Sequence, residues 1–202
     1  TRLIALLTLP AAAALFVLRD PIVGLMQRGQ FDPVASANTA RALAGLALGL
    51  VAFSIYLFVM RGFYAHHDTR TPFVINVGEN LINVVFAFVL VSRWGVLGLG
   101  LSYAIAYLVS AGWAVQVLGY KVPGCSVRTF TAGMWRPLLA AVLMAEAMWL
   151  MRRGVEQNSG WHALLQVVVS GGLGLVVYAA LLTALGVPEL AAVKARLRRR
   201  SG

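Results

Sequence analysis

The chain has 202 residues, of which 60% are hydrophobic and only 12% are charged, and its mean hydropathy is +0.80. Soluble domains carry about 25% charged residues, so this composition excludes an ordinary soluble enzyme or binding domain. The net charge is +10, but the cations that follow the last apolar segment indicate a flank beside anionic lipid headgroups and not a nucleic-acid-binding surface: Lys194, Arg196, Arg198, Arg199 and Arg200.

The first two apolar segments are each long enough to cross most or all of a membrane. The first runs over residues 3–18 and contains Pro10, which favours a kink because proline removes a helical hydrogen bond. The second runs over residues 35–60. Its Gly45 and Gly49 form a GxxxG pair, which predicts close approach of another helix.

The third segment begins after a polar loop predicted at residues 61–71, with Thr71 as the expected N-cap and Pro72 at the first helical position, and it ends near residue 92. The fourth covers residues 96–118. It carries small residues at four-residue spacing, which predicts a tightly packed face: Gly98, Ser102, Ala106 and Ser110.

Two further apolar segments, residues 135–151 and 161–185, complete the pattern. The sequence therefore predicts an all-α integral membrane protein with about six transmembrane helices. Its predicted parts are four helices in 1–118, a cytoplasmic loop in 119–134, two further helices in 135–186, and a basic cytoplasmic tail in 187–202.

The distribution of cations predicts the orientation. With six spans, both ends of the chain lie on one side of the membrane. Of the 17 cations, 11 fall on that side and 6 on the other, so the positive-inside rule places both ends in the cytoplasm. Without the tail the count is even, so this prediction depends on the tail. The single cysteine, Cys125, excludes an internal disulfide and a thiolate metal cluster.

The third segment holds the most polar set of residues within a predicted span: Asn76, Glu79, Asn80 and Asn83. Their spacing places them on neighbouring positions of one helical face. An ionised carboxylate is costly within a membrane, so Glu79 should face protein or a wet cavity. Two interpretations stay open: a cavity wall that handles a polar headgroup or a proton, and hydrogen bonding between helices with Glu79 neutral or paired.

Two charged residues in other segments have similar alternatives. Arg41 begins the second segment, and its planar guanidinium suits a diphosphate, although it can equally reach the lipid headgroups. Glu146 in the fifth segment is either a coupling carboxylate or a residue paired with a neighbouring helix.

The sequence predicts no catalytic residue, no metal site and no cofactor. His66, His67 and Asp68 are adjacent in a predicted loop, and adjacent residues rarely present the tetrahedral geometry that zinc requires. The motifs of zinc hydrolases, serine hydrolases and P-loop proteins are missing from the chain.

The loop at residues 61–72, RGFYAHHDTRTP, resembles the FYAxxDTxTP loop of the MurJ/MviN family, bacterial flippases of the lipid-linked peptidoglycan precursor. The order of Gly29, Gln30, Phe31 and Asp32, the segment 39–43, and the segment 95–99 are also similar to that family. Together these stretches cover about residues 20–110.

The resemblance implies a fourteen-span fold of the MOP superfamily, in which this chain supplies spans nine to fourteen and an N-terminal remainder supplies the others. It implies a central cationic cavity open alternately to each face, and a groove for the lipid tail at the last two helices. By motif, Arg41 and Asp68 match family residues. The Asp68 loop, with Arg70 and Pro72, is the expected gate or hinge.

The resulting hypothesis is a transporter of the bacterial cytoplasmic membrane. It would flip lipid II by alternating access, with Arg41 and the polar set of the third segment lining the cavity. Its expected partners are lipid II, membrane lipids and a possible cytoplasmic regulatory region after the tail. The alternatives are a flippase of another polyprenyl-diphosphate-linked glycan and a membrane scaffold that recruits cell-wall enzymes. A polytopic prenyl-lipid enzyme would need a carboxylate-rich loop that the chain lacks.

Overall fold

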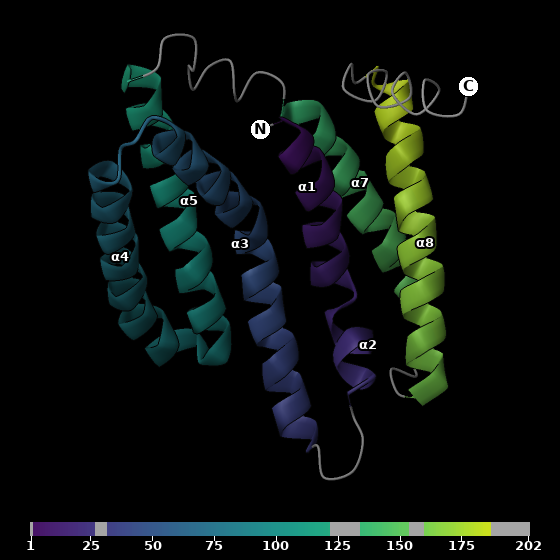
Figure 1. Cartoon of the computed structure of the whole chain (residues 1–202). Coiled ribbons are helices and arrows are strands. Elements are labelled where there is room, and N and C mark those ends of the chain that lie inside the picture. Colours follow the sequence, from purple (N-terminus) through teal and green to yellow (C-terminus); the bar gives the residue numbers. More distant parts are fainter. Residues whose placement is uncertain (1, 27–31, 122–133, 154–159, 187–202) are drawn as a thin grey trace.

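The computed structural model describes residues 2–26, 32–121, 134–153 and 160–186. Within these ranges every secondary-structure element is a helix. Figure 1 shows the helices, which are α1 (Arg2–Val17), α2 (Arg19–Gly24), α3 (Pro33–Ala65), α4 (Arg70–Trp94), α5 (Val96–Lys121), α7 (Trp135–Arg152) and α8 (Gly160–Ala184).

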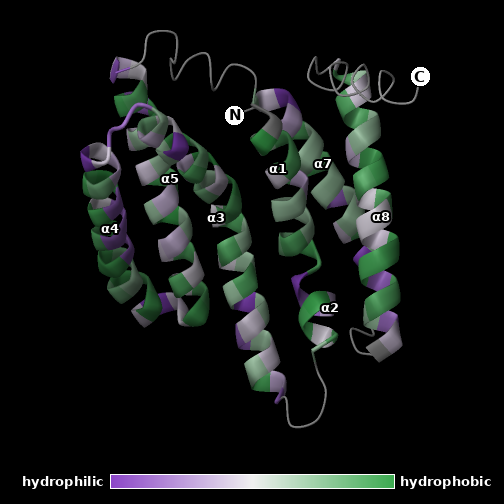
Figure 2. Cartoon of the chain, viewed as in Figure 1, coloured by the Kyte–Doolittle hydropathy of each residue, from purple (hydrophilic) through white to green (hydrophobic). Residues whose placement is uncertain are grey.

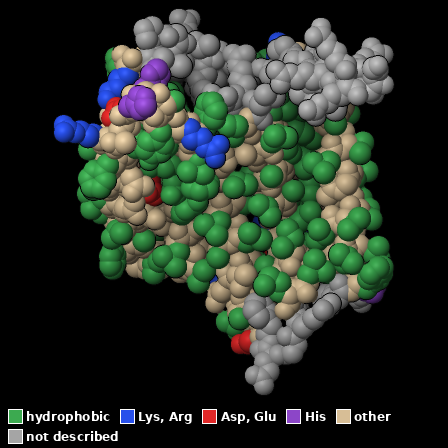
Figure 3. Space-filling model, viewed as in Figure 1, with side chains coloured by type: hydrophobic (Ala, Val, Ile, Leu, Met, Phe, Trp, Pro, Cys, Tyr) green, Lys and Arg blue, Asp and Glu red, His purple; other side chains and the backbone are tan. Residues whose placement is uncertain are grey.

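Four of these helices, α3, α4, α5 and α8, are long and apolar enough to cross a membrane. The apolar part of α1 is shorter, and α7 carries Arg136, Glu146 and Arg152 within its 18 residues. Hydrophobic side chains cover most of the face seen in Figure 3, and charged side chains and histidines gather at the end where α3 turns into α4. The predicted all-α membrane fold is confirmed, and the chain is a multi-pass membrane protein.

The helices form two groups that meet where α1 packs against α3. In the first group, α3 and α4 both pack on α5 and barely touch each other. In the second group, α7 and α8 pack together and α7 contacts α1, while α2 lies against both α3 and α8. Figure 1 shows the start of α1, the α3–α4 turn, the end of α5, the start of α7 and the end of α8 at the same end of the bundle.

Small residues bring α3 and α5 into direct backbone contact, as the GxxxG pair predicted. A Cβ atom added at Gly45 would lie 2.5 Å from the Cα atom of Gly100, and one added at Gly49 would lie 2.9 Å from the Cα atom of Ala104. The small residues at four-residue spacing in α5 are all buried. Without a hydrophobic driving force between helices in lipid, such close packing is a main source of association.

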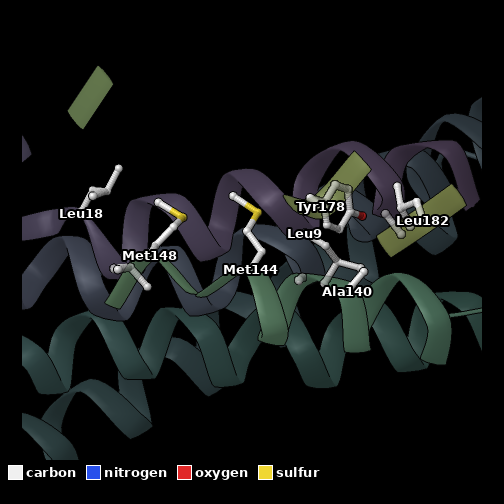
Figure 4. Close-up of a cluster of buried hydrophobic side chains, with 10 residues drawn as sticks. Leu9, Leu18, Ala140, Met144, Met148, Tyr178 and Leu182 are labelled. Carbon is white, nitrogen blue, oxygen red and sulfur yellow. The ribbon is translucent and has the colours of Figure 1, made fainter. Parts of the chain in front are cut away.

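The second group is held by a core of residues from α1, the break after it, α7 and α8, drawn in Figure 4: Leu9, Leu18, Ala140, Met144, Met148, Tyr178 and Leu182. Tyr178 also donates a hydrogen bond of 3.0 Å to the backbone oxygen of Leu6. This oxygen lacks its helical donor because Pro10, four residues later, has no N–H. The Tyr178 hydroxyl on α8 therefore supplies a donor to the carbonyl that Pro10 leaves free, and α1 continues through Pro10 as one helix.

Two local predictions need correction. Residues 61–65 were expected in a loop, but they are the last turn of α3, so only residues 66–69 separate the two helices. Thr71 was expected as the N-cap, but α4 begins at Arg70, and the Asp68 side chain accepts a hydrogen bond of 3.1 Å from the Thr71 N–H. The predicted end of the first segment at Leu18 is confirmed, because α1 and α2 separate there. Most of the 119–134 loop and the basic tail lie outside the described residues.

Candidate functional site

A groove between α3 and α4, with α5 beneath it, is lined by three of the predicted site residues, Pro72, Asn76 and Asn83. A hollow of about 590 Å³ lies near the α3–α4 turn and is lined in part by Tyr56, Arg61 and Asn76. A second hollow, of about 350 Å³, lies toward the other end of α4 and is lined in part by Asn83 and Ser102. The groove therefore presents polar groups between largely apolar walls.

Two asparagines of α4 connect it to the other walls of this groove. Asn76 Nδ2 donates a hydrogen bond of 3.3 Å to the hydroxyl of Tyr56 on α3. Asn83 Oδ1 accepts one of 3.0 Å from the hydroxyl of Ser102 on α5. Figure 2 shows the hydrophilic residues of α4 on the side turned toward α5. The interpretation of these asparagines as bonding residues between helices is thus supported by two observed contacts.

Glu79 is the most deeply buried of the polar set, with only 2% of its surface exposed. Asn80 Nδ2 donates a hydrogen bond of 3.1 Å to Glu79 Oε2, and within the described ranges no cation pairs with this carboxylate. Three tyrosines of α3 and α5 lie near this carboxylate: Tyr56, Tyr103 and Tyr107. The carboxylate is therefore enclosed between the three helices of the first group.

The three tyrosines near Glu79 pack against one another. The ring centroid of Tyr107 lies 5.3 Å from that of Tyr56 and 4.6 Å from that of Tyr103. Edge-on and tilted pairs of this kind are favourable arrangements of aromatic rings. Sequence reasoning did not select the tyrosines, and it assigned Ser102 only to a tightly packed face, because their spacing along α3 and α5 does not reveal which of them face α4.

Arg41 lies apart from the buried carboxylate. Its side chain is exposed on α3, and from Tyr56 back to Arg41 the helix covers roughly 22 Å at 1.5 Å per residue. Its neighbour Ala42 lines the smaller hollow, whereas Arg41 lines neither. The structure therefore brings Asn76, Glu79, Asn80 and Asn83 together, but it does not bring Arg41 into contact with them.

The α3–α4 turn is tied to the end of α5. Lys121 Nζ forms an ion pair with Asp68 Oδ2 and donates a hydrogen bond of 2.7 Å to Thr71 Oγ1. The Lys121 ammonium, and then the Thr71 N–H and hydroxyl, hold the pKa of the Asp68 carboxyl well below its usual range. Arg70 is exposed and Pro72 is buried in the first turn of α4. Lys121, which sequence reasoning did not select, is the residue that connects this turn to α5.

The remaining predicted residues lie outside the groove. His66 and His67 are exposed at the α3–α4 turn. Glu146 is exposed on α7, which belongs to the second group of helices.

Comparison with known proteins assigns the chain to a family. Residues 1–170 match the family described as "Lipid II flippase MurJ". The chain belongs to the MurJ family. A probable lipid II flippase MurJ of Rhizobium meliloti is 34% identical over 145 residues, which are 71% of this chain and 27% of that protein. The corresponding protein of Haemophilus influenzae is 31% identical over 205 residues, covering 92% of this chain and 37% of its own length.

A solved structure of a MurJ protein has the same fold. It is described as "Lipid II flippase MurJ, inward closed conformation", and it superimposes with a TM-score of 0.72 at 21% identity, over 90% of this chain and 36% of that one. This chain thus spans between a quarter and two fifths of the length of these MurJ relatives. Its groove is part of a larger helical assembly in the MurJ fold.

Proposed function

We propose that the full-length protein carrying this chain flips lipid II across the bacterial cytoplasmic membrane by alternating access. The match to the MurJ family over residues 1–170 carries this proposal. In it, α1 to α5 are part of the C-terminal lobe and α7 and α8 are the additional helix pair. The reaction is transport: the headgroup moves between leaflets and no covalent bond changes.

The polar groove supports a role in handling the headgroup. Polar side chains within a membrane are costly, and they commonly mark substrate pathways. Asn76 and Asn83 line the two hollows of the groove, and Asn80 is exposed beside them. In the proposal these amides face the sugar–peptide headgroup as part of the cavity wall, while the buried Glu79 positions α4 against α5.

Arg41 has a separate place in the proposal. Its side chain is exposed and its neighbour Ala42 lines the smaller hollow, and a guanidinium can donate two parallel hydrogen bonds to a diphosphate. In the proposal Arg41 contacts the diphosphate at one stage of transport, away from the asparagines that face the sugars.

The α3–α4 turn is proposed as a cytoplasmic gate or hinge. The positive-inside rule favours the cytoplasm for the end of the bundle that carries this turn. The ion pair between Asp68 and Lys121 joins the turn to α5, so a change in the packing of α4 on α5 would be accompanied by movement of the turn.

The decisive experiment measures lipid II in the outer leaflet of cells depleted of the full-length protein. An externally added toxin that degrades lipid II cleaves only the exposed molecules. We expect cleavage to fall while total lipid II accumulates. Unchanged cleavage, together with accumulation of another polyprenyl-linked glycan, would instead identify a flippase of that glycan. If lipid II cleavage and the amount of the other polyprenyl-linked glycan are both unchanged, and cell-wall enzymes are mislocalised, the protein is a scaffold.

The roles proposed for Arg41 and Glu79 are tested in the same assay by complementation. We expect a protein with both Arg41→Ala and Glu79→Ala to reach the membrane but to restore little toxin-accessible lipid II. Arg93→Ala, which removes an exposed arginine at the end of α4, is the matched control and should restore export. Wild-type growth and export with the double variant would remove these residues from the transport path.

A further inference from the structure

The break between α1 and α2 is stabilised by an arginine of the last helix pair. Pro21 has no N–H, so the backbone oxygen of Val17, four residues earlier, has no helical donor. Arg152, the last residue of α7, donates to this oxygen through Nη1, and its Nη2 lies 2.7 Å from Asp20 Oδ2. Only 15% of the Arg152 side chain is exposed. The guanidinium of Arg152 is therefore fixed at the break.

A hollow of about 410 Å³ opens beside this break, and Figure 2 shows the hydrophilic residues there between two apolar helices. Among the described residues that line it, three are arginines and one is an aspartate, so their net charge is +2. Its charged and aromatic lining residues are Phe16, Arg19, Asp20, Trp149, Arg152 and Arg153. No residue of the groove between α3 and α4 contributes to it.

Within the part of the chain that the structure describes, two of these arginines keep N–H donors without a protein acceptor. The Arg153 guanidinium lies 3.5 Å from the ring centroid of Trp149, and within the described ranges it has no carboxylate partner. Arg19 donates a hydrogen bond of 2.8 Å to the backbone oxygen of Phe16, and it lies 3.8 Å from Asp20. Because a guanidinium has five N–H donors, both side chains can bind a further acceptor.

We propose that this hollow binds the phosphate group of a membrane lipid, with Arg153 and Arg19 as its ligands and Arg152 as a positioning residue. Guanidinium groups bind phosphate oxygens through paired N–H donors, and stacking on Trp149 holds one of them in place. Trp149 is half-exposed, and tryptophan favours the level of lipid headgroups, where its ring can pack against the start of an acyl chain.

The excess positive charge favours a phosphate over a neutral headgroup. Cationic side chains of a membrane protein that lack a carboxylate partner commonly lie beside anionic lipid headgroups. The hollow lies at the ends of α1 and α7, away from the end that carries the α3–α4 turn. The proposal therefore places the site toward the outer leaflet. It does not require lipid II transport, because an ordinary anionic phospholipid supplies the same phosphate chemistry.

The test uses the purified full-length protein in detergent and native mass spectrometry, with phosphatidylglycerol as the probe and phosphatidylcholine as the neutral comparison. We expect preferential binding of phosphatidylglycerol, weakened about tenfold by Arg153→Gln, the loss expected for a hydrogen bond to a charged group. A protein with both Arg19→Gln and Arg153→Gln should show no preference. Arg93→Gln removes an exposed arginine elsewhere and should bind both lipids as the wild type does.

A second arm distinguishes the source of the phosphate, by competition with a polyprenyl diphosphate. Displacement of phosphatidylglycerol from the wild type, but no effect in Arg153→Gln, would assign the site to the carrier lipid. Binding that the diphosphate does not displace would assign it to phospholipid. Arg153→Lys keeps the positive charge but not the paired N–H donors, so this variant should bind phosphatidylglycerol with intermediate affinity. Its net charge equals that of the wild type, so a change in net charge cannot affect its folding. Equal lipid binding by wild type, Arg153→Gln and Arg93→Gln would overturn the proposal, whatever the result of the transport assay.

Discussion

At the scale of single residues, Asp68 has two functions in the structure. It caps the first turn of α4 through the Thr71 N–H, and it pairs with Lys121 at the end of α5. Both contacts stabilise the ionised carboxylate, which is why the pKa of Asp68 is lowered. The turn between α3 and α4 therefore depends on charge as well as on backbone geometry.

We expect Asp68→Asn to destabilise the full-length protein at neutral pH and to matter progressively less in acid. Folding lowers the pKa of this carboxyl group, so its ionised form stabilises the folded protein. This contribution is present at pH values above the pKa of the unfolded chain, about 4, and it is lost as the pH falls toward the lower pKa of the folded protein. The measurement is the thermal midpoint of both proteins at pH 7 and at pH values below about 4. Lys121→Gln serves as the partner variant. A difference between wild type and Asp68→Asn that grows on acidification would contradict this explanation.

His67 is the one non-glycine residue with a positive φ angle among the residues that the structure describes, with φ at 56°. The left-handed region costs about 1 kcal/mol or more for a residue with a Cβ atom, and glycine avoids this cost. We expect His67→Gly to stabilise the protein by up to about 1 kcal/mol, measured by unfolding in denaturing detergent. The neighbouring His66 has φ at −96°, so His66→Gly should be neutral or destabilising. Equal effects of the two substitutions would refute the role of backbone strain.

At the scale of helices, the contact of α3 with α5 depends on glycine pairs. A Cβ atom at Gly45 would lie 2.5 Å from a backbone atom of Gly100, so the two helices would have to separate. We expect Gly45→Ala to cost about 1–3 kcal/mol of stability, as overpacking usually does. Gly112→Ala is the matched control on α5, because its new Cβ atom would meet nothing within 4 Å. That variant should be neutral or slightly stabilising, since alanine is the better helix former.

The last helix pair satisfies the carbonyls that prolines leave free in the first helices. Pro10 cannot donate to the backbone oxygen of Leu6, and the Tyr178 hydroxyl donates to this oxygen instead. In the same way, Pro21 cannot donate to the backbone oxygen of Val17, and Arg152 donates to it instead. The positions of α7 and α8 against α1 are therefore specified by hydrogen bonds as well as by apolar packing. This explains how the polar backbone at both prolines is accommodated within a membrane, where water cannot supply the missing donor.

We expect Tyr178→Phe to destabilise the protein by about 1 kcal/mol, because it leaves the Leu6 oxygen without a donor. In a Pro10→Ala background the alanine N–H can take this place, so the same substitution should cost less. The four unfolding free energies form a double-mutant cycle, and their interaction energy is the measured quantity. A cost of Tyr178→Phe that is equal in both backgrounds would show that the hydroxyl acts elsewhere.

At the scale of the whole molecule, the helix ends divide into two sets at opposite ends of the bundle. The end of α5 and the start of α7 lie with the α3–α4 turn, and Cys125 belongs to the segment between them. With this cysteine as the single thiol, we expect a membrane-impermeant maleimide to label inverted vesicles and not intact cells. A cysteine introduced at Asn158, between α7 and α8, in a Cys125→Ser background should show the opposite result. Labelling of Cys125 in intact cells would reverse the proposed orientation.

The amino-acid sequence was sufficient to predict the six long helices and their approximate positions, but not the short helix α2 or the exact ends of α3 and α4. Continuous apolar segments must be helical in a bilayer, because each backbone group needs a partner within its own segment, and this requirement does not depend on the neighbours. The small-residue positions of α3 and α5 were predictable for a similar reason: closely packed helices need them at every fourth residue. The family could also be inferred, because the residues of the α3–α4 turn form a distinctive local motif.

Only the tertiary structure showed which partners these residues have. Tyr56, Ser102 and Lys121 meet the polar residues of α4 and the turn because of the rotation and height of three helices relative to one another. The separation of Arg41 from Glu79 has the same origin. Local sequence determines where a helix begins and which face is polar. The distances between faces depend on packing among side chains far apart in the chain, and no periodicity within one segment encodes them.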